Sequence, residues 1–179
     1  LAFKRGYLVS GTDVKASVVT ERLAALGIPV KLSHEASAVQ AARTIVRSSA
    51  IHDSNPEIIE SKRLKLPIIH RSEMLASLMK GRQSITVAGT HGKSTTSAMI
   101  VHMLTCLGLD PEAALGGAMR QYQSAARAGK GDWFVAEADE SDGSFIRYDP
   151  YCAVITNMDL DHMEFFKDSE GLQRAFVQH

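Results

Sequence analysis

Residues 84–98 are the part of this chain whose residue types and spacing are best suited to chemistry. An apolar strand pattern leads into Gly-Thr-His-Gly-Lys-Ser at 89–94, and a helical pattern follows. Glycines allow a tight turn that aims backbone N–H groups inward, Lys93 adds a positive charge, and Ser94 can present its hydroxyl to Mg²⁺. The segment therefore predicts a site for a polyphosphate at the start of a helix.

This loop is shorter than the common nucleotide-binding loop. Two residues separate Gly89 from Gly92, where the common pattern has four. A chance glycine turn before a helix is the alternative interpretation. The apolar strand before the loop and the apolar residues of 99–107 after it favour the phosphate site.

Two acidic segments follow apolar strand patterns further along the chain. Glu137 opens a run with four carboxylates in six residues, which repel one another unless a cation is present. For Asp139 and Asp142, a solvated pair that caps a helical turn is an equal alternative. Glu137 continues the strand edge, where an unpaired charge is costly, so we expect it to hold metal or act in catalysis. In the second segment, His162 lies among carboxylates, and metal binding, proton handling and a structural role all remain open.

Composition limits the classes of function. The 179 residues include twenty basic and twenty acidic ones, so no overall field attracts nucleic acid or an anionic membrane. No apolar run approaches the roughly 20 residues of a membrane-spanning helix, and the start lacks a secretory signal pattern. We therefore expect a cytoplasmic protein without membrane insertion. Cys106 and Cys152 are expected to be small buried hydrophobic residues in a reducing compartment.

Alternating strand and helix patterns predict an α/β fold with parallel sheets. The expected strands are 7–10, 29–32, 44–47, 67–70, 85–88, 133–136 and 153–156. A polar stretch at 80–83 predicts a boundary between a domain of residues 1–81 and a domain of residues 82–179. Residues 116–131 are interpreted as a glycine- and alanine-rich loop. Because parallel strands share their carboxyl ends, neighbouring strands would bring the phosphate loop, Glu137 and residues 159–164 to one crevice.

Together these motifs resemble those of the Mur ligase family, the ATP-dependent amide-forming enzymes of peptidoglycan synthesis. The resemblance covers nearly the whole chain. It rests on Gly-Thr-His-Gly-Lys-Ser-Thr-Thr at 89–96, Glu-Ala-Asp-Glu-Ser-Asp-Gly-Ser-Phe at 137–145, Thr-Asn-Met-Asp-Leu-Asp-His-Met-Glu at 156–164 and Ser-Ser-Ala-Ile-His-Asp-Ser-Asn-Pro-Glu at 48–57. The segment after Glu137 is the most discriminating, because sister ligases differ there. It is similar to the form in the family member that joins L-alanine to UDP-N-acetylmuramate.

The resemblance implies a reaction and a set of residues. ATP with Mg²⁺ would phosphorylate the lactyl carboxylate of UDP-N-acetylmuramate, and the amine of L-alanine would attack the acyl phosphate. The implied catalytic residues are Lys93, Glu137 and His162, and the implied metal ligands are Ser94, Glu137 and His162. The implied cofactor-binding residues are Gly89, Thr90, His91, Gly92, Lys93, Ser94, Thr95 and Asn157. The expected substrate-binding residues are Asp13, Ser48, Ser49, Ala50 and His91, with ordinary polar turns as the alternative for those in the first domain.

The resemblance also implies a domain organisation. Residues 1–81 would be a Rossmann-like domain for the UDP portion that lacks the family's first strand and glycine-rich turn. Residues 82–179 would be part of a P-loop-type ATP-binding central domain with a mainly parallel sheet. The family's C-terminal domain, which brings the amino acid, is absent from this sequence. We therefore expect an enzyme fragment that is inactive alone and works with the remaining domains of a longer chain.

Four alternatives remain at this point. Two are related amide ligases, one that attaches a recycled tripeptide to the same nucleotide sugar and one that makes folate polyglutamate. The others are a small-molecule kinase and a non-catalytic nucleotide-binding module. Phosphate release that requires both UDP-N-acetylmuramate and an amino acid would separate a ligase from the last two classes.

Overall fold

A computed structural model describes residues 1–139, 143–159 and 169–178 of the chain. The chain divides into two compact units, Ala2–Met74 and the part from Leu75 onward. The division falls within a helix, α3 (Arg71–Met79), a few residues before the expected boundary. Residues 1–81 and 82–179 stay our proposal for the two domains.

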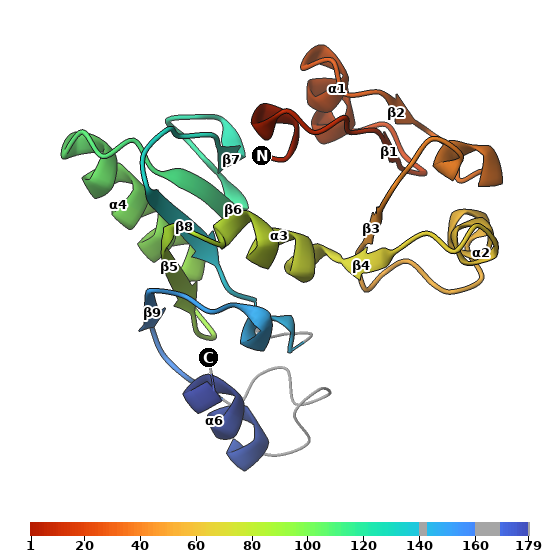
Figure 1. Cartoon of the computed structure of the whole chain (residues 1–179). Helices are drawn as coiled ribbons and strands as arrows, with labels where there is room; N and C mark the ends of the chain where they lie inside the picture. The colour runs from red at the N-terminus through yellow and green to blue at the C-terminus, as the bar shows by residue number, and fades with distance from the viewer. Residues whose placement is uncertain (140–142, 160–168, 179) are drawn as a thin grey trace. The chain divides into compact units, whose positions relative to one another are not determined.

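The first unit is built from short parallel strands and two helices of eight residues (Figure 1). Its elements are the 3-10 helix Phe3–Arg5, β1 (Gly11–Thr12), α1 (Val18–Ala25), β2 (Val30–Lys31), the 3-10 helix Ala36–Val39, β3 (Ile45–Arg47), α2 (Pro56–Arg63) and β4 (Ile68–His70). Strand β1 pairs with β2 and β3 pairs with β4, both in parallel. The first expected strand, 7–10, is wrong by a few residues, because the backbone pairs with β2 only at 11–12.

Local sequence signals set the helix starts in this unit. Ser17 and Thr20 form a reciprocal capping box at the beginning of α1. Asn55 caps α2, because its side-chain oxygen accepts the N–H of Glu57 at 2.9 Å, and Pro56 occupies the first helical position. These caps satisfy backbone N–H groups that a helix start otherwise leaves without partners.

The second unit is a five-stranded sheet in the order β7-β6-β8-β5-β9. Its elements are β5 (Gln83–Ala88), α4 (Lys93–Cys106), β6 (Glu112–Met119), β7 (Ser124–Arg127), β8 (Trp133–Glu137), the 3-10 helix Ser144–Arg147, β9 (Cys152–Ile155) and α6 (Ser169–Gln178). All pairings are parallel except that between β6 and β7. The predicted α/β fold with a mainly parallel sheet is therefore confirmed, and β5 lies between β8 and β9.

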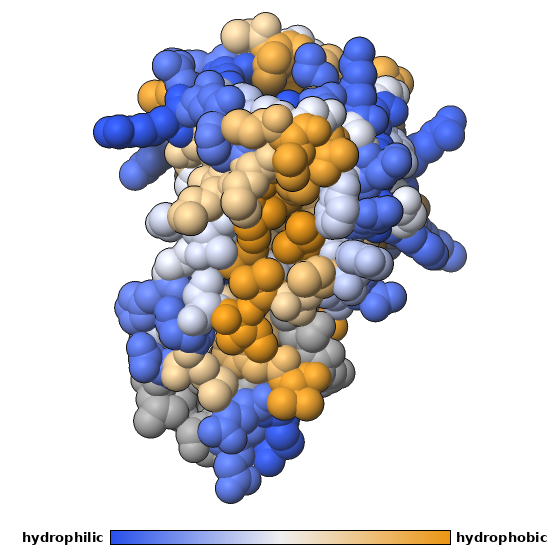
Figure 2. Space-filling model, turned by 90° about the vertical axis from the view of Figure 1, so that its left-hand side faces the viewer, coloured by the Kyte–Doolittle hydropathy of each residue, from blue (hydrophilic) through white to orange (hydrophobic). Residues whose placement is uncertain are grey.

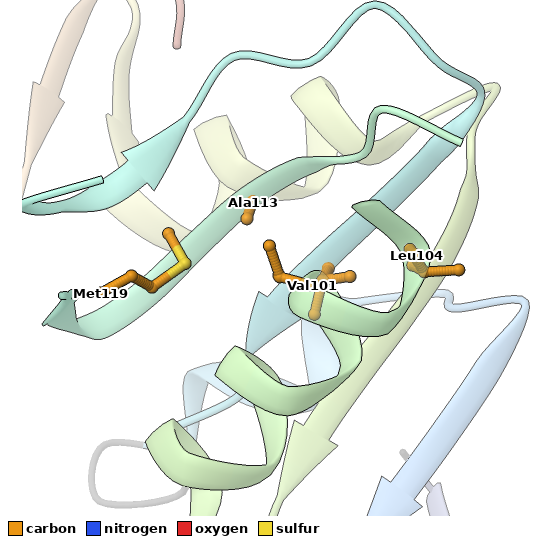
Figure 3. Close-up of a cluster of buried hydrophobic side chains, with 5 residues drawn as sticks. Val101, Leu104, Ala113 and Met119 are labelled. Carbon is orange, nitrogen blue, oxygen red and sulfur yellow. The ribbon is translucent and has the colours of Figure 1, made fainter. Parts of the chain in front are cut away.

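The core of the second unit forms where α4 packs on the sheet. Val101 and Leu104 of α4 are buried against Ala113 and Met119 of β6 and against Val135 of β8. Figure 3 shows Val101 directed from the helix toward Ala113 on the strand beneath it. Close packing here fixes the axis of α4 relative to the sheet. The packing therefore also fixes where the first turn of α4 lies.

Residues 116–131 are not a loop throughout, and this interpretation is wrong. Residues 112–119 and 124–127 are strands that pair antiparallel, with a register shift between Ala114 and Met119. Glycine and alanine have low strand propensity, so the sequence carries no strand signal. The pairing of β6 with β8 supplies the stabilisation that local propensity lacks.

One face of α4 remains exposed. Met99, Met103 and Leu107 are more than half exposed, and Ile155 of β9 is about half exposed. Figure 2 shows a strip of hydrophobic side chains on the side of the molecule that carries α4 and β9.

Both cysteines are free and exposed, so the expectation of buried thiols is wrong. In the described part of the chain, no helix combines the length and apolar character needed to span a membrane.

Candidate nucleotide and metal site

The loop between β5 and α4 depends on two glycines. Gly89 has φ +126° and Gly92, the residue before α4, has φ +83°, and side-chain-bearing residues rarely adopt either value. A Cβ at Gly89 would lie 2.3 Å from the Thr156 hydroxyl oxygen and 2.6 Å from the Asn157 carbonyl oxygen. Gly89 is therefore required both by its backbone conformation and by the close approach of the segment after β9.

Ser94 and Glu137 meet at the carboxyl end of the sheet. Val87 of β5 pairs with Glu137 of β8, so Glu137 lies beside the start of the loop. The Ser94 hydroxyl lies 3.0 and 2.9 Å from the two Glu137 carboxylate oxygens and donates to them. The N–H of Gly116 in β6 donates to Glu137 Oε2 at 2.7 Å. Two of the three residues that sequence reasoning assigned to Mg²⁺, Ser94 and Glu137, thus lie side by side.

Lys93 folds back over the loop. Its Nζ donates to the carbonyl oxygen of Gly89 at 2.7 Å and lies 3.4 Å from that of Thr90. The ammonium group is thus held over the loop, next to the first turn of α4. A cation in this place would meet an anion bound at the helix start.

The segment after β9 lies against the same loop. The Asn157 side chain bonds the backbone of His91, and the Asp159 N–H donates to the Thr90 hydroxyl at 2.9 Å. His91 Nδ1 lies 3.7 Å from Asp159 Oδ2, with both side chains largely exposed. The predicted meeting of the loop with the region after β9 is therefore observed as far as Asp159.

The expected site residues thus fall into three groups. The loop residues, Glu137 and Asn157 belong to one carboxyl edge of the second unit. His162 lies outside the described residues, so the structure says nothing of its place. The third group belongs to the first unit and comprises Asp13, Ser48, Ser49 and Ala50.

In the first unit the expected substrate residues follow their strands as polar turns. Asp13 comes after β1, and its carboxylate accepts the N–H groups of Val14 and Lys15 at 2.7 and 3.1 Å. Ser48–Ala50 come after β3, and the Ser49 hydroxyl lies 3.0 Å from His70 Nε2 at the end of the paired strand β4. These bonds account for the turns locally, and a role in substrate binding stays a prediction.

The oxygen donors at Ser94 and Glu137 suit a hard cation. Mg²⁺ prefers oxygen ligands and usually binds one or two carboxylates together with substrate phosphates. Among the described ranges 1–139, 143–159 and 169–178, no group of three or more His, Cys, Asp or Glu side chains is placed to hold a metal ion. The Ser94 hydroxyl and the Glu137 carboxylate are therefore donors of the kind that a magnesium ion with bound phosphate oxygens would use.

Sequence reasoning did not identify several contacts that the structure shows around polar side chains in each unit. Gly116 contacts Glu137 through its backbone, and a Cβ there would lie 3.0 to 3.1 Å from the carboxylate atoms. Nothing in the sequence marks this glycine, because the contact exists only once β6 and β8 pair. Thr156 was part of a quoted motif but received no role. In the first unit, Thr12 donates to Glu57 at 2.9 Å and His34 lies 3.3 Å from the same carboxylate, a network that no pattern indicated.

The mainly parallel sheet, with a glycine loop and a helix start after strand β5, which lies between β8 and β9, defines an α/β protein of the phosphate-loop class. Comparison with protein families gives two matches, "Mur ligase family, catalytic domain" over residues 1–83 and "Mur ligase middle domain" over residues 87–178. The chain belongs to the Mur ligase family, and the resemblance inferred from its motifs is confirmed.

Curated relatives agree with this assignment. The UDP-N-acetylmuramate–L-alanine ligase of Geotalea daltonii is 47% identical over 173 residues, which cover 97% of this chain and 38% of the relative. The ligase of the same name from Anaeromyxobacter sp. (strain Fw109-5) is 46% identical over 172 residues, 96% of this chain and 38% of the relative. The chain thus spans less than half the length of these relatives.

Solved structures show the same fold. The UDP-N-acetylmuramate-alanine ligase of Thermotoga maritima matches with a TM-score of 0.92 and 31% identity, over 99% of this chain and 42% of that one. The UDP-N-acetylmuramate:L-alanyl-γ-D-glutamyl-meso-diaminopimelate ligase of Neisseria meningitidis matches with a TM-score of 0.90 and 29% identity, over 99% of this chain and 61% of that one.

Proposed function

We propose that this chain is the nucleotide-sugar and ATP-binding part of an enzyme that joins L-alanine to the lactyl carboxylate of UDP-N-acetylmuramate in the cytoplasm. The observation that carries the proposal is the contact between the Ser94 hydroxyl and both Glu137 carboxylate oxygens, directly beside a phosphate-type loop. Transfer of a phosphoryl group to a carboxylate brings two anions together. Such a reaction requires cationic groups and N–H donors around the transferred phosphate.

The chain's own residues divide this work. Lys93 would neutralise the β- and γ-phosphates of ATP from its position over the loop. The N–H groups of the first turn of α4 would donate to phosphate oxygens. Ser94 and Glu137, with His162, would hold Mg²⁺, which when bound screens the charge of the phosphates and of the acceptor carboxylate. In the amide-forming step the neutral amine of L-alanine would form the new C–N bond and lose a proton to solvent, the bond between the carbonyl carbon and the phosphate oxygen would break, and inorganic phosphate would leave with the electron pair.

The tripeptide-recycling ligase is the nearest alternative, since it shares the fold. The curated relatives at 46–47% identity are L-alanine ligases, which supports L-alanine, whereas the solved structures of the two kinds of ligase match at 31% and 29% identity and do not separate them. A small-molecule kinase and a non-catalytic module are less well supported, because the chain belongs to a ligase family and retains Lys93, Ser94 and Glu137.

Phosphate release by the full-length gene product tests the proposal. With ATP and Mg²⁺, release should require both UDP-N-acetylmuramate and L-alanine, and glycine, L-serine and the tripeptide should serve as comparison substrates. Lys93→Met, which keeps the aliphatic stem but removes the charge, should lower turnover at least about 100-fold with an unchanged circular dichroism spectrum. Release that is independent of the amino acid, or full activity of the variant, would refute this function.

A further inference from the structure

Residues 156–159 contact the phosphate loop through several hydrogen bonds. The Asn157 side chain makes two of them with one residue: its Oδ1 accepts the His91 N–H and its Nδ2 donates to the His91 carbonyl, each at 2.9 Å. The Asn157 carbonyl oxygen also accepts the N–H of Thr90 at 3.2 Å. An asparagine amide offers both a donor and an acceptor, which a carboxylate or a hydroxyl of similar reach does not.

Thr156 adds a second point of attachment. Its hydroxyl lies 2.6 Å from the His91 carbonyl oxygen and 3.2 Å from that of Ala88, while its N–H donates to Ala88 at 3.0 Å. Gly89 lies so close to this segment that a Cβ would overlap it. Ala88, just before the loop, and His91, within it, are therefore both hydrogen-bonded to the segment that follows β9.

These contacts separate two kinds of N–H group in the loop. Those of Thr90 and His91 are used by Asn157 and are not directed to a ligand. Those of Gly92, Ser94 and Thr95, at the start of α4, have no hydrogen-bond partner within the described ranges. An incoming phosphate would therefore meet free donors at the helix start and find the earlier part of the loop already bonded.

We propose that Asn157, with Thr156, is a positioning residue that holds the loop in its phosphate-binding shape and does not itself contact the nucleotide. This inference rests on the proposed function and changes the role that the family resemblance implied for Asn157. Without the clamp, the loop samples other conformations, and nucleotide affinity falls in proportion to the fraction of molecules with the competent shape.

The test compares variants of the full-length gene product by hydrogen exchange and by ATP binding. Asn157→Ala removes both side-chain bonds, and Asn157→Asp keeps the acceptor for the His91 N–H but loses the donor. Exchange of the Thr90 and His91 amides should become at least tenfold faster in Asn157→Ala and less so in Asn157→Asp. ATP binding should weaken about tenfold in Asn157→Ala, a change of about 1.4 kcal/mol.

Two matched controls make the result specific. Thr156→Val removes the hydroxyl at nearly constant shape and should speed exchange of the Thr90 and His91 amides. Thr156→Ser keeps the hydroxyl and should keep this exchange slow. Met158→Ala changes an exposed neighbour in the same segment and should leave exchange at Thr90 and His91 unaltered. Slow exchange of the β5 amides in every variant shows that the sheet remains folded.

The outcome also distinguishes this inference from the proposed function. Exchange is measured without ligand, so it decides the clamp even if the protein binds no ATP. Weaker ATP binding in Asn157→Ala with unchanged exchange at Thr90 and His91 would overturn the inference, because Asn157 would then act as a direct ligand. Unchanged exchange and unchanged binding would overturn it as well.

Discussion

The close approach at Gly89 gives a sharp prediction, because the same loop contains a second glycine with positive φ whose surroundings are open. Gly89 and Gly92 both have positive φ, at +126° and +83°. A Cβ at Gly92 would meet nothing within 4 Å, whereas at Gly89 it would lie 2.3 and 2.6 Å from atoms of Thr156 and Asn157. Comparing Gly89→Ala with Gly92→Ala therefore measures the steric overlap together with the cost of the larger φ at Gly89.

The magnitudes follow from the geometry. Alanine in the left-handed region costs about 1–2 kcal/mol, offset by roughly 0.4–1 kcal/mol because the unfolded chain loses freedom. Gly92→Ala should therefore destabilise by about 1 kcal/mol. Gly89→Ala adds overpacking, about 1–3 kcal/mol, against a backbone carbonyl that already accepts the N–H of Thr90 and cannot move freely. We expect Gly89→Ala to cost about 2 kcal/mol more than Gly92→Ala.

Urea unfolding of the 179-residue chain measures this difference. Trp133 is the sole tryptophan in the sequence and lies in β8, paired with Gln83 of β5, so its fluorescence follows the sheet that carries the loop. Unfolding midpoints convert to free energies when the slopes agree among variants. Equal destabilisation by the two substitutions, within about 0.5 kcal/mol, would refute the argument from close packing.

Two further predictions concern charge. Glu137→Gln keeps an acceptor for the Gly116 N–H but removes the charge that would bind Mg²⁺, so Mg²⁺-dependent phosphate release by the full-length gene product should fall at least about 100-fold, and a variant with normal Mg²⁺ dependence would contradict the role. The Lys130 N–H and the Arg127 guanidinium hold the pKa of the Asp110 carboxyl below its ordinary value of 3.8. A lowered folded-state pKa stabilises the fold above the ordinary value, and this contribution disappears as the pH falls through the folded-state pKa. Asp110→Asn should therefore destabilise the chain at pH 7 and converge with the wild type in acid denaturation below about pH 4, whereas a gap that stays constant with pH would exclude this linkage.

Much of the second unit could be predicted because its signals are local. The apolar run of β5, the glycine turn and the helix after it appear in sequence order, and the structure places them as expected. Glu137 could be singled out because a carboxylate directly after a buried strand is costly without a partner. The partners that the structure supplies are the Ser94 hydroxyl and the Gly116 N–H.

What could not be predicted depends on pairing between distant segments. The β6–β7 hairpin has no local signal, since Gly116 and Gly117 weaken a strand that survives by pairing with β8. The exposure of the two thiols could not be predicted for the same reason. An apolar helix pattern does not say which face is covered, and the sheet covers Val101 and Leu104 while Cys106 stays outside.

The short spacing of the loop acquires a physical reason from these contacts. A longer loop can bond its own N–H and carbonyl groups, but a loop with two residues between its glycines has few internal partners. Here the partners come from outside the loop. The Lys93 ammonium group donates to the Gly89 carbonyl oxygen, and the side chains of Thr156 and Asn157 donate to the His91 carbonyl oxygen. Because β9 pairs directly with β5, its end always lies beside the loop. Strand β9 thus supplies the partners that a longer loop would provide itself, and the N–H groups of Gly92, Ser94 and Thr95, which have no partner among the described residues, remain for an anion.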